Sequence, residues 1–185
     1  MKTKQKMTTY QLAVTALMAA LLCILGPMSV PIGEVPISLT NLVIYFAVFL
    51  LGTKLGTASY IVYLLLGAFG LPVFSAYSGG LGKLAGPTGG YLIGFIPMAL
   101  ISGLFLEKSG GKPWITALGM ALGTLVAYAL GTVWFCFQTG TGFVAALFIC
   151  VIPFLPVDAL KIAAAVGFGS LLRGRLVKAG LLEKR

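Results

Sequence analysis

Charged residues are scarce in this chain: only 9% of its 185 residues are Asp, Glu, Lys or Arg, whereas a soluble domain carries roughly 25%. Hydrophobic residues make up 59% of the sequence. So few charges on so apolar a chain exclude an ordinary soluble domain. The composition therefore predicts an integral membrane protein.

Histidine is absent, and the chain has only four carboxylate residues, so acid–base and metal chemistry have few side chains to use. The three cysteines, Cys23, Cys136 and Cys150, all lie in apolar stretches. Their odd number and unpaired spacing argue against a disulfide framework or a zinc site, and we interpret them as packing residues. The sequence predicts no metal centre.

Nucleotide-binding motifs are also missing. The stretch 79–83 (GGLGK) matches a P-loop only in part, because Tyr77 occupies an earlier glycine position and Leu84 follows the lysine where Ser or Thr is required. The net charge of +9 does not indicate nucleic-acid binding, because the cations flank apolar segments and membrane topology explains them better. We therefore expect no cofactor, no ATP hydrolysis by this chain and no nucleic-acid partner.

Six apolar segments predict six transmembrane helices within a single membrane domain, residues 1–185. Their approximate bounds are 10–27, 38–51, 57–69, 89–106, 114–137 and 156–172. The first segment follows three lysines, as in a signal peptide, but it is too long for one and no clean cleavage site follows, so we expect it to be retained. The segment 143–152 is only about ten residues long, which is typical of a re-entrant or interfacial helix.

The positive charges predict the orientation. If the chain crosses six times, eleven of the 13 Lys and Arg residues lie on the side of the N-terminus, Lys83 alone lies on the other side, and Lys161 lies inside a helix. Cationic loops remain in the cytoplasm, so we expect both termini there. The segments 28–40, 70–88 and 138–155 then share the external side.

The stretch from Gly70 to Phe95 is crowded with glycine and lies between two strongly apolar segments. Loops longer than about 12–15 residues are usually functional or disordered, and this one has too many apolar residues for disorder. An ordinary connection between two helices is the alternative. Its candidate ligand contacts are Ser78, Gly79 and Tyr91, and Phe95 is a candidate wall of an apolar pocket.

Asp158 and Lys161 are three residues apart in the last apolar segment and therefore share a helix face. An ionisable residue inside a membrane is costly and marks a functional site by default. One interpretation is a self-neutralising pair that merely tolerates burial. The other is a ligand site, in which Asp accepts and Lys donates hydrogen bonds to a urea, amide or carboxylate. Asn41, at the outer end of the second segment, is a candidate ligand contact, helix cap or interhelical bond.

Ala16 and Ala20 are four residues apart in the first segment and share a face on which a second helix can approach closely. The partner of this face is either another helix of the same chain or a separate subunit.

Several blocks of the sequence resemble the BioY family, the biotin-binding S components of energy-coupling factor (ECF) transporters. The blocks are 70–74 (GLPVF), 79–80 (GG), 84–91 (LAGPTGGY) and 153–161 (PFLPVDALK). The resemblance covers nearly the whole chain. The block 84–91, which contains GPTGGY, is specific to the family when it occurs together with the distant Pro-x-Asp-x-x-Lys of 156–161.

The resemblance implies a six-helix S component in the prokaryotic cell membrane that binds biotin on the external side and has no ATPase activity. A membrane T component and a pair of cytoplasmic ATPases would supply the energy. Asp158, Lys161 and a residue of the glycine-rich stretch resemble the family's contacts to the ureido ring, although Ser78 stands where relatives carry Asn. Ala16 and Ala20 resemble the surface that S components offer to the T component.

Other function classes remain open at this point. The chain is alternatively an S component for a different vitamin or a small self-sufficient permease. An intramembrane enzyme is least supported, because Asp158 and Lys161 are the only candidate acid–base pair.

Overall fold

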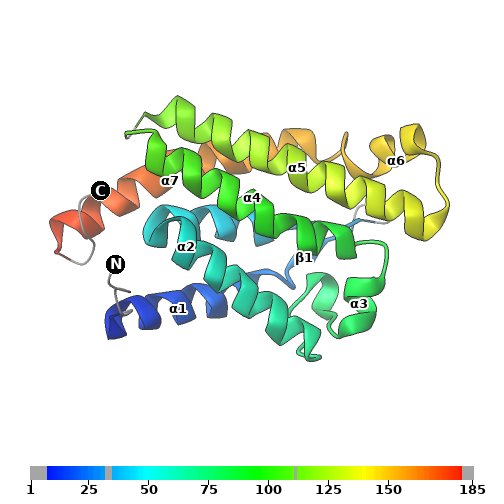
Figure 1. The fold of residues 1–185 in the computed structure, drawn as a ribbon, viewed down its shortest axis with the longest axis horizontal. Helices are drawn as coiled ribbons and strands as arrows, with labels where there is room; N and C mark the ends of the chain where they lie inside the picture. The colour runs from blue at the N-terminus through cyan, green and yellow to red at the C-terminus, as the bar shows by residue number, and fades with distance from the viewer. Residues whose placement is uncertain (1–7, 32–34, 111, 181–185) are drawn as a thin grey trace, which may run out of the picture.

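The computed structural model of the chain describes residues 8–31, 35–110 and 112–180. Within those ranges the chain is almost entirely helical (Figure 1). The elements are α1 (Thr9–Leu25), β1 (Ser29–Val30), β2 (Ile37–Ser38), α2 (Thr40–Ala68), the 3-10 turn η1 (Ser75–Tyr77), α3 (Leu81–Ala85), α4 (Gly89–Lys108), α5 (Pro113–Thr139), α6 (Phe143–Cys150) and α7 (Leu155–Lys178). Among these residues, α2, α4, α5 and α7 are long and apolar enough to cross a membrane, and α1 is a shorter apolar helix of 17 residues.

Helix α2 is folded back on itself at Gly52. This residue has φ 80° and ψ −177°, a conformation that glycine adopts without a steric penalty. A Cβ atom at Gly56 would lie 2.8 Å from the Cα atom of Val48, whereas eight residues of continuous helix would separate the two positions by about 12 Å. The two halves of α2 therefore pack against each other. The sequence predicts two segments joined over 52–56, and the structure makes the turn at Gly52 alone.

The break at Gly52 is supported by side chains from two other helices. The backbone N–H of Thr53 donates to Glu107 Oε1 of α4 at 3.0 Å. The carbonyl of Phe49 accepts a hydrogen bond from Arg173 of α7 at 2.9 Å. Backbone groups that a helix break leaves free are costly when they have no partner, so these contacts stabilise the turn.

Small residues allow the remaining helices to pack closely. Helices α4 and α5 share the most extensive interface, where Gly119 lies against Phe105 and Gly123 against Met98. Gly169 of α7 lies against the ring of Phe49. Such positions leave no room for a side chain, so glycine is required there by packing and not by backbone conformation.

We expect Gly56→Ala to lower the melting temperature of the purified protein. The added Cβ would meet the Val48 backbone, and overpacking of this kind typically costs about 1–3 kcal/mol. Gly167→Ala is the matched control, because nothing lies within 4 Å of a Cβ built there and alanine favours a helix. Equal melting temperatures for the two variants, measured in one detergent, would contradict the packing assigned to Gly56.

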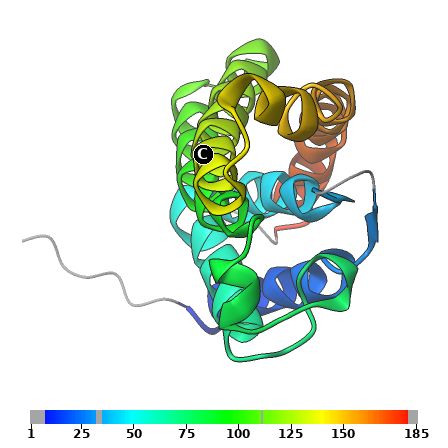
Figure 2. The same cartoon turned by 90° about the vertical axis from the view of Figure 1, so that its right-hand side faces the viewer.

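Three irregular segments gather at one end of the bundle, which faces the viewer in Figure 2. The first carries the β1–β2 pair, in which Ser29 is opposite Ser38. The second carries η1 and α3, and the third carries α6. These are the segments that the sequence places together on one side. Residues 32–34 of the first segment lie outside the described residues.

Some bounds differ from those expected. Helix α7 extends from Leu155 to Lys178, six residues beyond the expected end at 172, because it continues through the basic residues of the tail. Helix α5 begins at Pro113, which suits a first-turn position, and ends before Gly140 in the left-handed conformation. The short apolar segment forms α6 over Phe143–Cys150.

Candidate functional site

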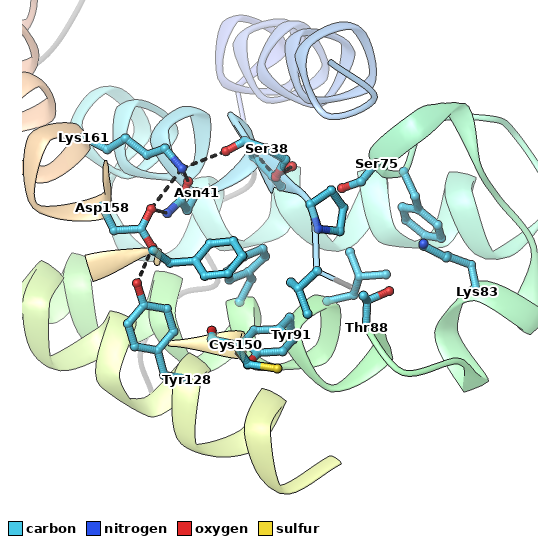
Figure 3. Close-up of a pocket in the computed structure, with 17 residues that line it drawn as sticks. Ser38, Asn41, Ser75, Lys83, Thr88, Tyr91, Tyr128, Cys150, Asp158 and Lys161 are labelled. Atoms are coloured by element: carbon cyan, nitrogen blue, oxygen red, sulfur yellow. Dashed lines mark hydrogen bonds and ion pairs between the residues drawn. The ribbon is translucent and has the colours of Figure 1, made fainter. Parts of the chain in front are cut away.

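A cavity of about 640 Å³, measured with its open mouth, lies at the end of the bundle where the irregular segments gather (Figure 3). Its wall combines residues from β2, the start of α2, the glycine-rich stretch, α4, α5, α6 and α7. Asp158, Lys161, Asn41 and Tyr91 all line it. Four of the six ligand contacts that the sequence predicts are therefore in one place.

Asp158 and Lys161 lie in the first two turns of α7, and their residues are only 6% and 7% exposed. Lys161 Nζ lies 2.9 Å from Asp158 Oδ1. The partial positive charge of the α7 N-terminus favours the carboxylate at this position. Burial of a charged pair is tolerated only when further hydrogen bonds satisfy both groups, so their other partners decide what the pair can do.

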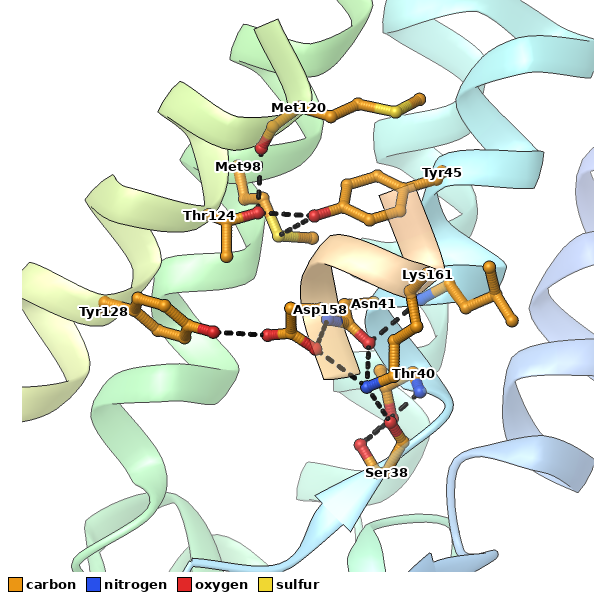
Figure 4. Close-up of polar contacts among 11 residues, drawn as sticks. Ser38, Thr40, Asn41, Tyr45, Met98, Met120, Thr124, Tyr128, Asp158 and Lys161 are labelled. Carbon is orange, nitrogen blue, oxygen red and sulfur yellow. Dashed lines mark hydrogen bonds and ion pairs between the residues drawn. The ribbon is translucent and has the colours of Figure 1, made fainter. Parts of the chain in front are cut away.

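Asn41 joins the pair to helix α2 (Figure 4). Its Nδ2 donates to Asp158 Oδ1 at 2.9 Å, and its Oδ1 accepts from Lys161 Nζ at 3.0 Å. Asn41 Oδ1 also accepts from the backbone N–H of Leu42 at 3.1 Å. Of the roles that the sequence leaves open, the structure gives Asn41 an interhelical bond and a place on the cavity wall.

Tyr128 of α5 completes the network, and the sequence gives no sign of it. Its hydroxyl donates to Asp158 Oδ2 at 2.6 Å. A tyrosine in an apolar helix, thirty residues from its partner, resembles any other buried or interfacial aromatic. Only the packing of α5 against α7 brings the two side chains together.

The network leaves limited hydrogen-bonding capacity for a ligand. Lys161 Nζ donates to Ser38 O at 2.8 Å as well as to Asn41 and Asp158, so its three donors are used. Asp158 Oδ1 accepts two hydrogen bonds and Oδ2 accepts one. An ionised carboxylate can accept about four, so Oδ2 retains an acceptor position. A ligand N–H group can therefore bind Asp158 directly, whereas a ligand carbonyl must replace one acceptor of Lys161.

Ser78 and Gly79 are not among the cavity residues. The Ser78 hydroxyl donates to the Ser75 carbonyl at 2.7 Å, and residues 74 and 78 pair as an isolated bridge. This local turn directs Phe74 and Ser75 to the cavity wall in place of Ser78. The glycine-rich stretch thus lines the cavity with Phe74, Ser75 and Tyr91, whereas Ser78 and Gly79 do not line it.

Aromatic side chains form much of the apolar wall. Tyr91, Phe95 and Phe154 line the cavity. The Tyr91 hydroxyl interacts with Thr132 Oγ1 at 3.1 Å and donates to the Cys150 carbonyl at 3.3 Å, so its ring is fixed between α5 and α6. A cavity with an apolar body and a charged pair at one end suits a ligand that is largely apolar with a polar head.

The glycine-rich stretch is tied to its neighbours at several points. Trp134 Nε1 and Gln138 Nε2 of α5 donate to the carbonyls of Gly86 and Ala85 at 2.9 and 2.7 Å. The backbone N–H of Ala76 lies 3.0 Å from Ser29 Oγ. These bonds hold the stretch over the cavity.

Ala16 and Ala20 are exposed on the outward face of α1. Their neighbours Leu17 and Ile24 are 61% and 63% exposed. Neither alanine is therefore buried against another helix among the described residues. The described residues contain no group of three or more His, Cys, Asp or Glu that could hold a metal ion.

Comparisons with known proteins agree on one family. The model of the BioY family matches residues 1–178. A probable biotin transporter BioY of Pyrococcus horikoshii is 37% identical over 91% of this chain and 99% of its own length. The biotin transporter BioY of Thermotoga maritima is 43% identical over 65% of this chain and 71% of its own.

A solved structure agrees with the sequence matches. A crystal structure of the S component for biotin from an ECF-type ABC transporter superposes with a TM-score of 0.84. It is 32% identical, and the match covers 91% of this chain and 95% of that one. The family model, the relatives and the solved structure agree, and the chain belongs to the BioY family.

Proposed function

We propose that this chain is the biotin-binding S component of an ECF transporter. The observation that carries the proposal is the buried network of Asp158, Lys161, Asn41 and Tyr128 at one end of an apolar cavity. Membership of the family indicates that the ligand is biotin, since the named relatives are biotin transporters. The chain itself is a multi-pass membrane protein, and we place it in the cell membrane.

The ureido ring of biotin fits the chemistry of the network. It offers two N–H donors and one strongly polar carbonyl acceptor on an otherwise apolar bicycle. Asp158 Oδ2 retains an acceptor position for an N–H group. Lys161 can donate to the carbonyl if it releases Ser38 O or Asn41 Oδ1. The aromatic wall would then enclose the apolar rings.

We expect the protein to bind biotin without converting it into another compound. Titration calorimetry of the purified protein with biotin should give one site per chain and return the ligand unchanged. Uptake should require a T component and ATPases supplied separately. A protein that binds no biotin, or that prefers a different vitamin, would contradict the proposal and favour the alternative S component.

Tyr128→Phe is expected to weaken biotin binding several-fold. The change removes the hydroxyl that donates to Asp158 Oδ2 and holds this carboxylate in place. A hydrogen bond to a charged group contributes about 1.5–3 kcal/mol to its own pair, and only part of this is lost to the ligand when the carboxylate is less well positioned. Tyr45→Phe is the matched control, because its hydroxyl interacts with Thr124 and Met98 and does not line the cavity. Calorimetry should show weaker binding for the first variant only. Equal affinities would mean that Tyr128 serves packing alone.

For topology, we propose six crossings, counting the two halves of α2 separately, with both termini in the cytoplasm. The cation distribution supports this orientation. In a variant without Cys23, Cys136 and Cys150, a cysteine placed at Ser78 or Thr139 should react with an impermeant maleimide on intact cells. A cysteine at Ser109 should react only after the membrane is opened. Labelling of the cysteine at position 109 on intact cells would contradict this orientation.

A further inference from the structure

A second cavity lies at the opposite end of the bundle from the candidate site, where α5 begins and α7 ends (Figure 1). Its volume is about 1270 Å³, measured with its open mouth. The end of α4, the start of α5 and the second half of α7 form most of its wall. This is the end that we propose to face the cytoplasm, and the network around Asp158 uses none of these residues.

An open apolar groove between α5 and α7 adjoins the second cavity. The groove is lined by Trp114, Ala117, Leu118 and Ala121 of α5 and by Ala159 and Ile162 of α7. On α7, Ile162 of the groove is one turn before Val166 of the cavity, and on α5 Trp114 directly follows Pro113 of the cavity. Trp114 and Leu118 are 65% and 46% exposed, so the groove opens toward the membrane.

The face that α7 presents to the two hollows changes from apolar to cationic toward the end of the helix. Ile162 and Val166 form the apolar part. Ser170, Arg173 and Lys178 follow on the same face. About 18 Å of helix separates Val166 from Lys178. An apolar groove that ends beside cations matches a phospholipid, whose acyl chain is followed by a phosphate.

The charges on the wall of the second cavity favour an anionic headgroup. Arg173 and Lys178 outnumber the one carboxylate there, that of Glu107. Hydrogen bonds to backbone groups hold Arg173 and Glu107 at the turn of α2. Lys178 is exposed and has no ion pair within the described part of the chain. Basic pockets between transmembrane helices on the cytoplasmic side bind anionic lipid headgroups.

Trp114 gives the depth of the site in the membrane. It lies in the first turn of α5, at the boundary between the groove and the second cavity. Tryptophan is enriched at the level of the lipid headgroups. The cationic part of the wall is therefore at the membrane surface, where a lipid phosphate lies, and the groove is at the depth of the acyl chains.

We propose that the groove and the second cavity together bind one phospholipid with an anionic headgroup from the cytoplasmic leaflet. An acyl chain packs along the groove against Ala117 and Leu118. The phosphate lies near Lys178, and Arg173 contributes its positive charge. A free phosphate ion would use the cations alone and leave the apolar groove without a ligand. The site lies beyond the proposed biotin function and does not depend on it.

The test titrates the purified protein in detergent with dioleoyl phosphatidylglycerol and with dioleoyl phosphatidylcholine, which have the same acyl chains. Native mass spectrometry should show one phosphatidylglycerol bound per chain, about fivefold more tightly than phosphatidylcholine. One cation near an anionic lipid contributes about this factor. Lys178→Gln should reduce the preference to less than about twofold and leave the affinity for phosphatidylcholine unchanged. Lys178→Arg should retain the preference because it keeps the charge.

Lys54→Gln is the matched control. It removes an exposed lysine beside the Gly52 turn, at the same end of the bundle but outside the groove and the second cavity. This variant should retain the preference for phosphatidylglycerol. If it loses as much as Lys178→Gln, the lipid responds to the general charge of this surface and the proposed site is wrong.

A variant of the groove tests the contact with the acyl chain. Ala117→Phe places a ring in the groove and should weaken both lipids by the same factor. Unchanged affinities would show that the groove holds no acyl chain. Displacement of phosphatidylglycerol by millimolar inorganic phosphate would indicate a site for a small anion and overturn the lipid assignment.

Two further results would overturn the proposal. Equal affinities of the wild-type protein for the two lipids would contradict the role of the cations. In the variant without native cysteines, a cysteine at Leu118 that cross-links two chains in the membrane on addition of an oxidant would show that a second copy of this chain occupies the groove. Neither result bears on biotin binding, which calorimetry tests separately.

Discussion

Asp158→Asn is expected to weaken biotin binding by at least tenfold. The carboxylate accepts hydrogen bonds from Asn41, Lys161 and Tyr128, and it offers the acceptor position proposed for the ureido N–H groups. An asparagine amide has one oxygen in place of two and presents N–H donors where acceptors are needed. The loss of one hydrogen bond to a charged group corresponds to about 1.5–3 kcal/mol, which is tenfold or more in affinity.

The same change also leaves Lys161 without its counter-charge. Removal of one partner from a buried ion pair typically costs about 3–5 kcal/mol, so the single variant should be destabilised as well as defective in binding. Asp158→Asn combined with Lys161→Met removes the uncompensated charge. We expect the double variant to melt at a higher temperature than the single variant and still to bind biotin poorly. Wild-type affinity in the double variant would make the pair purely structural.

Glu107→Gln is the matched control for this experiment. Glu107 lies in α4, where it contacts the Gly52 turn of α2 outside the cavity around Asp158. The variant makes the same acid-to-amide change at that position. The amide oxygen can still accept from the N–H of Thr53. Its biotin affinity should therefore equal that of the wild-type protein, which would separate the effect of the Asp158 position from that of removing any carboxylate.

The sequence predicts the helices well because each carries a long apolar segment bounded by glycine, proline or charge. It is less informative about the turns. The connection after Leu51 looks like five residues in the sequence, but Gly52 can adopt a positive φ and turns the chain by itself. The end of α7 is missed for a different reason: apolarity ends near Leu172, whereas the hydrogen bonds of the helix continue to Lys178.

The site is predictable where its residues are close in sequence. Asp158 and Lys161 stand out because charge is rare in apolar segments and their spacing places them on one face. Tyr128 depends on the packing of α5 against α7, for which the sequence has no local signal. In the glycine-rich stretch the choice between Ser75 and Ser78 depends on a turn in which Ala76 and Tyr77 adopt positive φ. Non-glycine residues seldom do so, and sequence patterns do not predict it.

Ala20→Trp is expected to abolish most biotin uptake while leaving biotin binding unchanged. Ala20 is exposed on α1, together with Ala16 one turn before it. Small residues on a membrane-facing helix surface let a second helix approach closely, and we propose that this second helix belongs to the T component. An indole at this position would hold the partner helix away. The cavity lies among other elements, so affinity should change by no more than about twofold.

Uptake of labelled biotin should be measured in cells that also produce the T component and the ATPases, beside calorimetry on the purified variant. Ala163→Trp is the matched control, because Ala163 is an exposed alanine of α7 outside the cavity. Ala19→Trp supplies the contrast: Ala19 is 3% exposed, so a bulky side chain there should damage folding and binding together. If Ala20→Trp behaves like Ala19→Trp, the face of α1 serves packing within the chain. If it behaves like Ala163→Trp, the face is in contact with lipid alone, and the T component docks elsewhere.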